Sequence, residues 1–231
     1  MEKKRIVVLT GAGVSAESGI STFRDSGGLW EKYDISEVAT PEAWARNQDL
    51  VMEFYNQRRK QLFEVEPNAA HYALVKLEEK YDVQIITQNV DDLHERAGSK
   101  NVMHLHGELK KVRSSVDENL VYELEGWELK KGDTCEKGSQ LRPHIVWFGE
   151  PVPMIPHAAE LCSTADILII IGTSLNVYPA AGLVNYTQPG CPVYLIDPAD
   201  VSVSHIPGVK VIREKAGTGT VQLVNELTER S

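Results

Sequence analysis

The sequence has 231 residues, of which 42% are hydrophobic, and its formal net charge is −9. A chain of this length forms one large domain, or one domain with a modest insertion, around a core of ordinary size. The acidic balance argues against nucleic acid or an anionic membrane as the main partner, because both are themselves negatively charged.

The cysteines form no C-x-x-C pair, which argues against a disulfide scaffold and favours a reducing compartment: Cys135, Cys162 and Cys191. The basic first residues are followed by an apolar run that is too short for a signal peptide or a membrane span. We therefore expect a soluble, cytoplasmic protein.

The stretch from Arg5 to Asp25 organises the chain. Its apolar residues 6–9 are typical of a strand buried on both faces. Residues 11–16 then read GAGVSA, which fits the G-x-G-x-x-G/A phosphate-turn pattern. Gly11 allows a tight turn, and Gly13 lets the backbone approach a pyrophosphate at the N-terminus of a following helix. The pattern also fits a turn without a ligand, and the acidic residue that a dehydrogenase carries about 20 residues further on is missing.

Further along the chain, strand and helix patterns alternate. We expect helices within 41–80, with Asn68 as an N-cap, a brief helix that ends at Gly98, a helix from residue 179 and a last helix capped by Thr220. Strands are expected at 6–9, 83–87, 102–107, 144–148, 167–172, 193–196 and 209–212. This order predicts an α/β fold with a parallel sheet covered on both faces, and the charged segment 108–142 reads as a small inserted module.

The carboxyl ends of parallel strands meet at one edge of a sheet, where ligands bind. Here those ends are polar or rich in glycine: 11–13, 88–91, 106–107, 172–174 and Asp197. His104 and His106 are two residues apart and would share a face of a strand, so either a metal pair or a structural role for one of them is open. His106 precedes the turn at Gly107 and is the better candidate for a general base.

Asp197 has two readings. Its carboxylate at a strand end suits the two hydroxyls of an adenosine ribose and would repel a 2′-phosphate, which favours NAD over NADP. It equally suits the opening of a turn with Pro198.

Five segments in series resemble the motifs of the sirtuins, which are NAD-dependent protein-lysine deacylases: GAGVSAESGISTFRD, TQNVDDLHERAG, HLHGEL, RPHIVWFGE and GTSLNVYPA. The resemblance implies an α/β fold with a Rossmann-like parallel sheet domain and a smaller domain formed by two insertions. On this basis we expect segments 1–35, 81–107 and 143–231 to form the NAD-binding domain, and segments 36–80 and 108–142 to form the small domain.

The resemblance also implies a set of site residues. His106 matches the catalytic base, with Asn89 at the nicotinamide ribose and Asp91 at the nicotinamide carboxamide. The implied NAD contacts are Gly11, Ala12, Gly13, Ser15, Phe23, Arg24, Gln88, Asn89, Asp91, Gly172, Thr173, Ser174, Asn176 and Asp197, although the family usually has Asn at the last position. Val146, Phe148 and Gly149 would line the acyl-lysine tunnel. A target peptide would add as a strand between Gly149-Glu150 and Asn176-Val177.

The implied reaction gives free lysine, nicotinamide and O-acyl-ADP-ribose from acyl-lysine proteins or peptides, and it needs no metal. Many relatives hold a structural zinc with two C-x-x-C pairs. The matching positions here are Ser114, Asp117, Cys135 and Gly138, so we expect a metal-free module. The resemblance leaves the oligomeric state open, a monomer included.

Tyr55 and Arg58 are three residues apart and share a helix face. They resemble the pair in the branch of the family that removes succinyl and malonyl groups. The alternative is a solvated face across Arg58-Arg59-Lys60 with a packing tyrosine. The rival functions are a dehydrogenase, a non-catalytic NAD sensor and a protein ADP-ribosyltransferase.

Overall fold

The computed structural model describes residues 3–20 and 33–229. Its larger part is a six-stranded sheet in the order β3-β2-β1-β7-β8-β9, in which every neighbouring pair is parallel. The strands are β1 (Arg5–Thr10), β2 (Asp82–Thr87), β3 (Val102–His104), β7 (Ile167–Ile171), β8 (Val193–Ile196) and β9 (Lys210–Ile212). The strand order reverses between β1 and β7, and this switch point is where open α/β sheets bind ligands.

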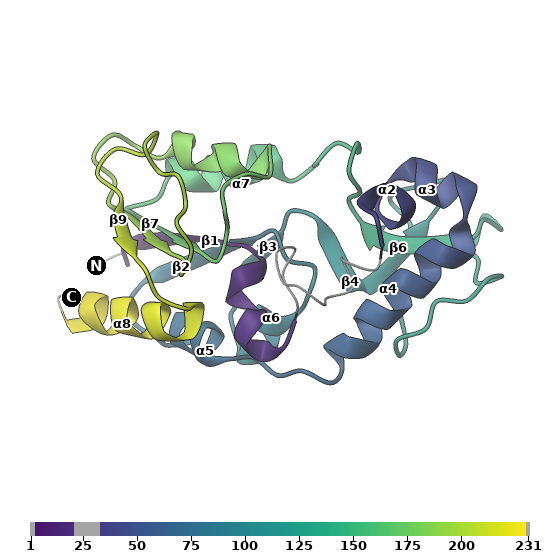
Figure 1. The fold of residues 1–231 in the computed structure, drawn as a ribbon, viewed down its shortest axis with the longest axis horizontal. Helices are drawn as coiled ribbons and strands as arrows, with labels where there is room; N and C mark the ends of the chain where they lie inside the picture. Colours follow the sequence, from purple (N-terminus) through teal and green to yellow (C-terminus); the bar gives the residue numbers. More distant parts are fainter. Residues whose placement is uncertain (1–2, 21–32, 230–231) are drawn as a thin grey trace.

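Both faces of this sheet are covered, and strand β1 shows why its apolar run is unbroken. Val7 and Leu9 point into one core, and Ile6 and Val8 point into the other, as the two-residue period of a strand requires. Helix α7 (Ile155–Ser163) and the 3₁₀ segment η3 (Ala180–Tyr186) cover the first face, whereas α5 (Ala69–Leu77) and α8 (Ala216–Glu229) cover the second (Figure 1). Burying each such side chain contributes about 1.5–3 kcal/mol.

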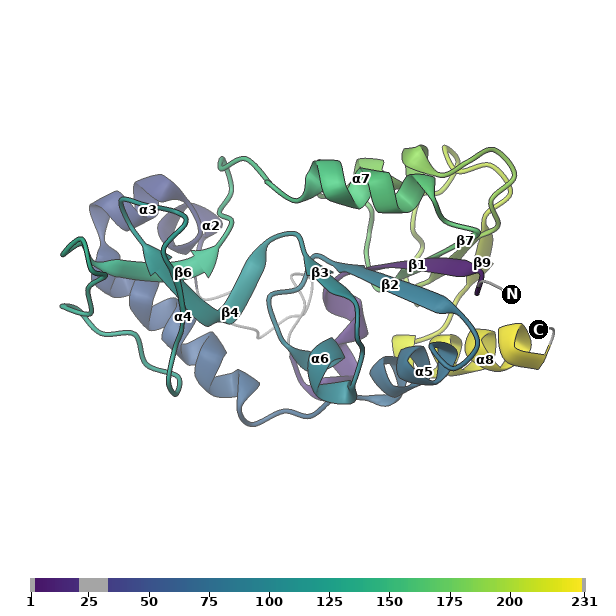
Figure 2. The ribbon, with the colours of Figure 1, turned by 180° about the vertical axis from the view of Figure 1, so that it is seen from behind.

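A second, smaller unit lies at one end of the large sheet (Figures 1 and 2). It contains an antiparallel sheet in the order β5-β4-β6 and three helices: β4 (Gly107–Ser114), β5 (Val121–Glu123), β6 (Leu141–Ile145), α2 (Ile35–Val38), α3 (Pro41–Arg46) and α4 (Gln48–Leu62). Phe54, Val112 and Ile145 belong to a core shared by these elements. The predicted fold class, a parallel α/β domain with a smaller second domain, is confirmed.

The domain division drawn from the sequence remains a proposal. Helix α5 lies inside the segment 36–80, but Leu74 and Leu77 belong to the core under the large sheet. We therefore propose that this boundary falls before Ala69.

Arg59 joins α4 to the inserted module. Its side chain is fully buried, and its guanidinium donates to the carbonyls of Leu109 and Trp127 and to the side chain of Asn56. Burial lowers the pKa of Arg59 to about 10. The reading of Arg58-Arg59-Lys60 as a solvated face is therefore wrong for Arg59, because carbonyls from distant segments replace the water.

Several local expectations were also wrong. Helix α8 begins at Ala216, ahead of Thr220, because the amide of Gly217 donates to the Glu17 carboxylate at 2.6 Å and so supplies the helix start. The glycine turn leads into two short 3₁₀ segments, η1 (Ala12–Val14) and η2 (Ala16–Ser18), instead of an α-helix. The segment after Pro179 is likewise 3₁₀, and Gly182 inside it weakens the α-helical form.

Candidate active site

The ends of β1 and β7 pack backbone against backbone at the switch point. Gly11 donates to the Ile171 carbonyl at 3.0 Å, and Gly13 donates to the Gly172 carbonyl at 2.9 Å. A Cβ on Gly13 would lie 2.6 Å from the Cα of Gly172, and Gly172 itself has φ +62°. These glycines are thus required by the close approach of two loops, a cause that the sequence pattern did not reveal.

Ser15, Asn89 and Asp91 form one buried cluster beside this turn, each with at most 8% of its surface exposed. The side-chain amide of Asn89 donates through Nδ2 to Ser15 Oγ at 3.1 Å, and Ser15 Oγ donates to Asp91 Oδ2 at 3.0 Å. Burial raises the pKa of Asp91, and its hydrogen bonds offset only part of that effect. The chain thus brings three of the predicted residues together, although Ser15 and Asn89 are 74 residues apart.

His106 lies between strands β3 and β4 with its ring half-buried. Its Nδ1 is 3.1 Å from the Gln88 carbonyl oxygen, and a carbonyl only accepts, so Nδ1 carries the proton and Nε2 keeps a lone pair. Burial lowers the pKa of His106, which keeps the ring neutral near pH 7. This is the protonation state of a general base. The strand ends at His104, so the two histidines do not share a strand face.

The remaining predicted cofactor residues differ in their surroundings. Gln88 Nε2 donates to Thr173 Oγ1 at 3.2 Å and so links the ends of β2 and β7. Ser174 is half-buried, and Asn176 is exposed. Asp197 Oδ1 accepts from Ala199 N at 2.8 Å, which is the turn-opening contact, and its ribose role stays a prediction. Phe23 and Arg24 lie outside the described residues.

Tyr55 and Arg58 lie on helix α4. The Tyr55 hydroxyl accepts from Trp147 Nε1 at 3.0 Å, and burial raises the pKa of Tyr55 to about 12. Burial lowers the pKa of Arg58, while Tyr55 and Asp91 act on it in the opposite direction. The guanidinium carbon of Arg58 lies 5.7 Å from the centroid of the Phe54 ring, and the charges of Tyr55 and Asp91 both favour the cation.

The predicted peptide strip is partly exposed. Phe148 and Val177 are 45% and 39% exposed, Val146 is half-buried, and Gly149 has φ +90°. The Val146 amide donates to the His106 carbonyl at 2.9 Å, which ties this strip to the candidate base.

Glu150 is engaged within the protein. Its carboxylate accepts from Arg142 at 2.8 and 3.1 Å and from the Trp147 amide at 2.8 Å. The side chain therefore holds the loop, whereas the predicted added strand concerns its backbone and stays a prediction.

Hydrogen bonds connect the four positions that match the zinc ligands of relatives, which are Ser114, Asp117, Cys135 and Gly138. Cys135 Sγ lies 3.3 Å from Ser114 Oγ and 3.2 Å from Ser139 Oγ, and these hydroxyls lower the pKa of Cys135 to about 6. Asp117 accepts from Lys137 at 2.7 Å. Across residues 3–20 and 33–229, no group of three or more His, Cys, Asp or Glu side chains is placed to hold a metal ion.

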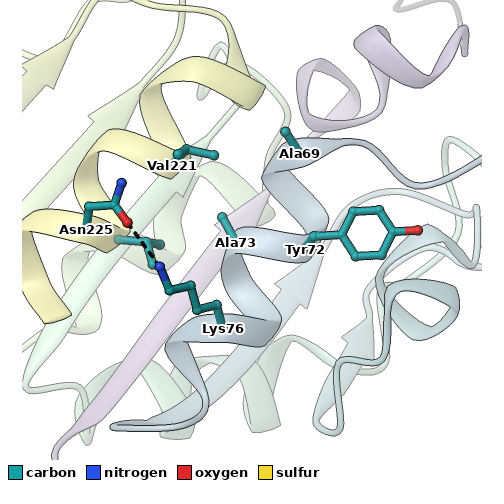
Figure 3. Close-up of a pocket in the computed structure, with 7 residues that line it drawn as sticks. Ala69, Tyr72, Ala73, Lys76, Val221 and Asn225 are labelled. Atoms are coloured by element: carbon teal, nitrogen blue, oxygen red, sulfur yellow. Dashed lines mark hydrogen bonds between the residues drawn. The ribbon is translucent and has the colours of Figure 1, made fainter.

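A shallow hollow lies elsewhere, between α5 and α8 (Figure 3). Ala69, Ala73 and Val221 line it, and Lys76 spans it to Asn225 at 3.3 Å. It carries no acid–base pair and no glycine turn, so we assign no chemistry to it.

Comparison with known proteins identifies the family. Residues 11–179 match the Sir2 family. The chain belongs to the Sir2 family. An NAD-dependent protein deacylase of Bacteroides thetaiotaomicron is 56% identical over 95% of this chain and 96% of its own. One of Helicobacter pylori is 56% identical over 98% of each chain.

Solved Sir2 structures share the fold. A Sir2 homologue in complex with NAD is 42% identical, with a TM-score of 0.89 over 99% of this Sir2 chain and 91% of its own. A Sir2 structure described with a deacetylated p53 peptide and an acetyl ADP ribose is 30% identical, with a TM-score of 0.78 over 100% and 94% of the two chains. In the part of the chain that the structure describes, no helix has the length and apolar character needed to cross a membrane.

Sequence reasoning missed two side chains behind the predicted site. Trp147 was quoted only within a motif, yet it contacts Tyr55, and its ring lies 3.4 Å from the Arg142 guanidinium carbon. His104 was weighed as a metal ligand or a structural residue, yet it bonds the Asn89 carbonyl at 2.9 Å and Glu95 at 2.7 Å. The spacing of His104 and His106 was the available signal, but the partners come from other elements.

Proposed function

We propose that this Sir2 protein is an NAD-dependent protein-lysine deacylase that prefers acidic acyl groups, succinyl and malonyl, to acetyl. Family membership and the named activity of the two curated relatives support NAD-dependent deacylation. The preference for acidic acyl groups is supported by the placement of Arg58 on α4, three residues after the buried Tyr55, whose hydroxyl accepts from Trp147.

The switch point between β1 and β7, at the edge where open α/β sheets bind ligands, is where NAD would bind. Gly11, Gly13 and Gly172 keep side chains out of the crossing between two loops, where a Cβ would collide with backbone. Ser15 and Asn89 add hydrogen-bonding groups beside them. When bound, NAD supplies an electrophilic sugar carbon and nicotinamide as the leaving group.

The protein's own groups supply orientation and a base. The side-chain nitrogen of Asn89 donates to Ser15 Oγ, which leaves the Asn89 side-chain oxygen to accept a further hydrogen bond. His106 Nε2 takes a proton from a hydroxyl of the bound sugar, since its Nδ1 proton is committed to the Gln88 carbonyl. From acyl-lysine, NAD and one water, the expected products are free lysine, nicotinamide and O-acyl-ADP-ribose.

Tyr55 is prepared as a hydrogen-bond donor. Its oxygen accepts from the Trp147 indole, so its own proton is free to point at another group. The raised pKa of about 12 keeps that proton on the oxygen at neutral pH. Arg58 adds a cation that pairs with a carboxylate. A succinyl or malonyl carboxylate can accept from both side chains, whereas an acetyl group ends in a methyl and has no terminal carboxylate to offer them.

Replacing Arg58 tests this preference. Arg58→Met should lower kcat/KM on succinyl- and malonyl-lysine peptides about ten- to a hundredfold, the cost of a charge-assisted bond, and change deacetylation little. Lys60→Met is the matched control, because Lys60 is exposed on the same helix. Equal losses on all three peptides would show that Arg58 supports the fold instead of the acyl end.

A further inference from the structure

His104 and His106 bond two successive carbonyls of one segment. His106 Nδ1 is 3.1 Å from the Gln88 oxygen, and His104 Nδ1 is 2.9 Å from the Asn89 oxygen. The main-chain N–H of Asn89 in turn donates to Thr87 Oγ1 at 3.0 Å. The main chain of Asn89 is thus held at its nitrogen by Thr87 and at its oxygen by His104.

The second nitrogen of His104 has a partner as well. Nε2 is 2.7 Å from Glu95 Oε1 on α6 (Leu93–Ala97), and the His104 side chain is only 8% exposed. A carbonyl and a carboxylate both only accept, so each ring nitrogen must donate. Both bonds exist together only in the imidazolium form of His104.

The charges around His104 favour that form. Burial alone disfavours the cation, but the bond and charge of Glu95, the Asn89 carbonyl and Glu108 on β4 outweigh it, so the pKa of His104 is raised. The pKa of Glu95 is lowered although burial opposes this, because His104 and Lys111 stabilise its charge. The other titratable groups that His104 acts on are Asp91 and His94, and the cation lowers the pKa of both.

We propose that His104 and Glu95 are positioning residues, which hold the Asn89 main chain for the reaction and make activity fall at alkaline pH when His104 loses its proton. The inference rests on the proposed roles of Asn89 and His106. Neutral His104 has one N–H for two acceptors, so one of its bonds breaks and Asn89 is released or Glu95 is left unpaired. The defect should therefore reduce kcat more than it raises KM for the peptide.

Two measurements test the proposal. The first is an NMR titration of the His104 ring in the wild-type protein without substrate, in which we expect a pKa above 6.5. The second is the pH profile of deacetylation. Glu95→Gln removes the charge but keeps an acceptor, and it should move the alkaline limb to lower pH by about one unit. His104→Gln keeps one donor without a titratable proton, and it should lower kcat about tenfold at pH 7 and remove that limb.

Glu160→Gln and His157→Gln are matched controls, because both residues are exposed on α7, and both variants should keep the wild-type profile. A His104 pKa at or below 6.5, or an unchanged alkaline limb in Glu95→Gln, would overturn the proposal. The titration needs no substrate, and the profile uses acetyl-lysine, so a failed preference for succinyl leaves this test intact. If His104→Gln does not fold, the titration and Glu95→Gln decide the matter.

Discussion

Trp147 donates its indole N–H to the hydroxyl of Tyr55 across 3.0 Å, and both side chains are almost fully buried. The Tyr55 oxygen accepts this bond, so its own proton remains to be donated elsewhere. Arg142 stacks on the Trp147 ring, with its guanidinium carbon 3.4 Å from the ring centroid, and Glu150 forms an ion pair with that arginine. Arg142 and Glu150 therefore help to hold Trp147 where its indole N–H reaches Tyr55.

Trp147→Phe removes this donor and keeps an aromatic ring in place. We expect kcat/KM on a succinyl-lysine peptide to fall several-fold, in keeping with the roughly 0.5–1.5 kcal/mol of a neutral hydrogen bond, while deacetylation changes little. Tyr55→Phe in the same background tests the coupling. If the tryptophan acts through the tyrosine, the double variant should lose no more than Tyr55→Phe alone. Additive losses would contradict the coupling.

Arg59→Met should destabilise the fold. The substitution leaves the carbonyls of Leu109 and Trp127 without their donor inside the protein. Each buried acceptor left unpaired costs about 1–3 kcal/mol, so the free energy of unfolding in urea should fall by about 2–5 kcal/mol. Lys60→Met, on the exposed face of the same helix, should cost at most about 1 kcal/mol, the size of the exposed contact of Lys60 with the Trp127 ring at 5.5 Å. A small effect in Arg59→Met would show that water replaces the guanidinium.

Stability should fall in mild acid because of two buried histidines. His71 and His94 pack edge to face with ring centroids 4.8 Å apart, and burial lowers the pKa of His71 to about 4 and that of His94 well below its usual value. The unfolded chain thus binds more protons between about pH 4 and 6.5. Stability is therefore full above pH 6.5 and declines as pH drops toward 4, and full protonation of His71 costs on the order of 3 kcal/mol.

His71→Gln checks this acid dependence. The His71 Nδ1 accepts from the Asn68 amide at 3.1 Å, and glutamine supplies an acceptor at this capping-box position without titrating. Urea midpoints of this variant should change less between pH 7 and pH 4.5 than those of the wild type. His157→Gln, an exposed site, should retain the wild-type slope. A slope in His71→Gln equal to that of the wild type would disprove the role of His71.

Metal removal should leave the inserted module intact. A closed structural zinc site needs four ligands, and here one thiol, Cys135, is bonded to Ser114 and Ser139 while the Asp117 carboxylate pairs with Lys137. We expect elemental analysis to find less than one zinc per chain, and EDTA to leave the melting temperature unchanged. One zinc per chain that survives dialysis against EDTA would refute this prediction.

Local sequence patterns predicted the elements whose cause is local. The apolar run of β1 predicted a strand buried on both faces, and the polar strand ends predicted that the turn after β1 and residues 88–91 would meet. Ser15 was added by the resemblance to the sirtuins. Each pattern is visible in a short stretch of sequence, and the parallel order of the strands brings their carboxyl ends to one edge.

Features that depend on distant partners could not be predicted in this way. Arg59 lies in a basic run that looks solvated, and its burial depends on carbonyls 50 and 68 residues away. The start of α8 depends on Glu17, which is 200 residues from Gly217. The position of His104 shows the same limit, because Glu95 and Asn89 reach it from other elements.

A competition assay among acyl-lysine peptides measures directly whether this protein removes acidic acyl groups in an NAD-dependent reaction. The wild-type protein is incubated with NAD and equal amounts of succinyl-, malonyl- and acetyl-lysine versions of one peptide, and all products are followed by mass. We expect the succinyl and malonyl peptides to be consumed first, each with one equivalent of nicotinamide and the matching O-acyl-ADP-ribose. Acetyl-lysine consumed as fast or faster, or acyl loss without nicotinamide release, would contradict it.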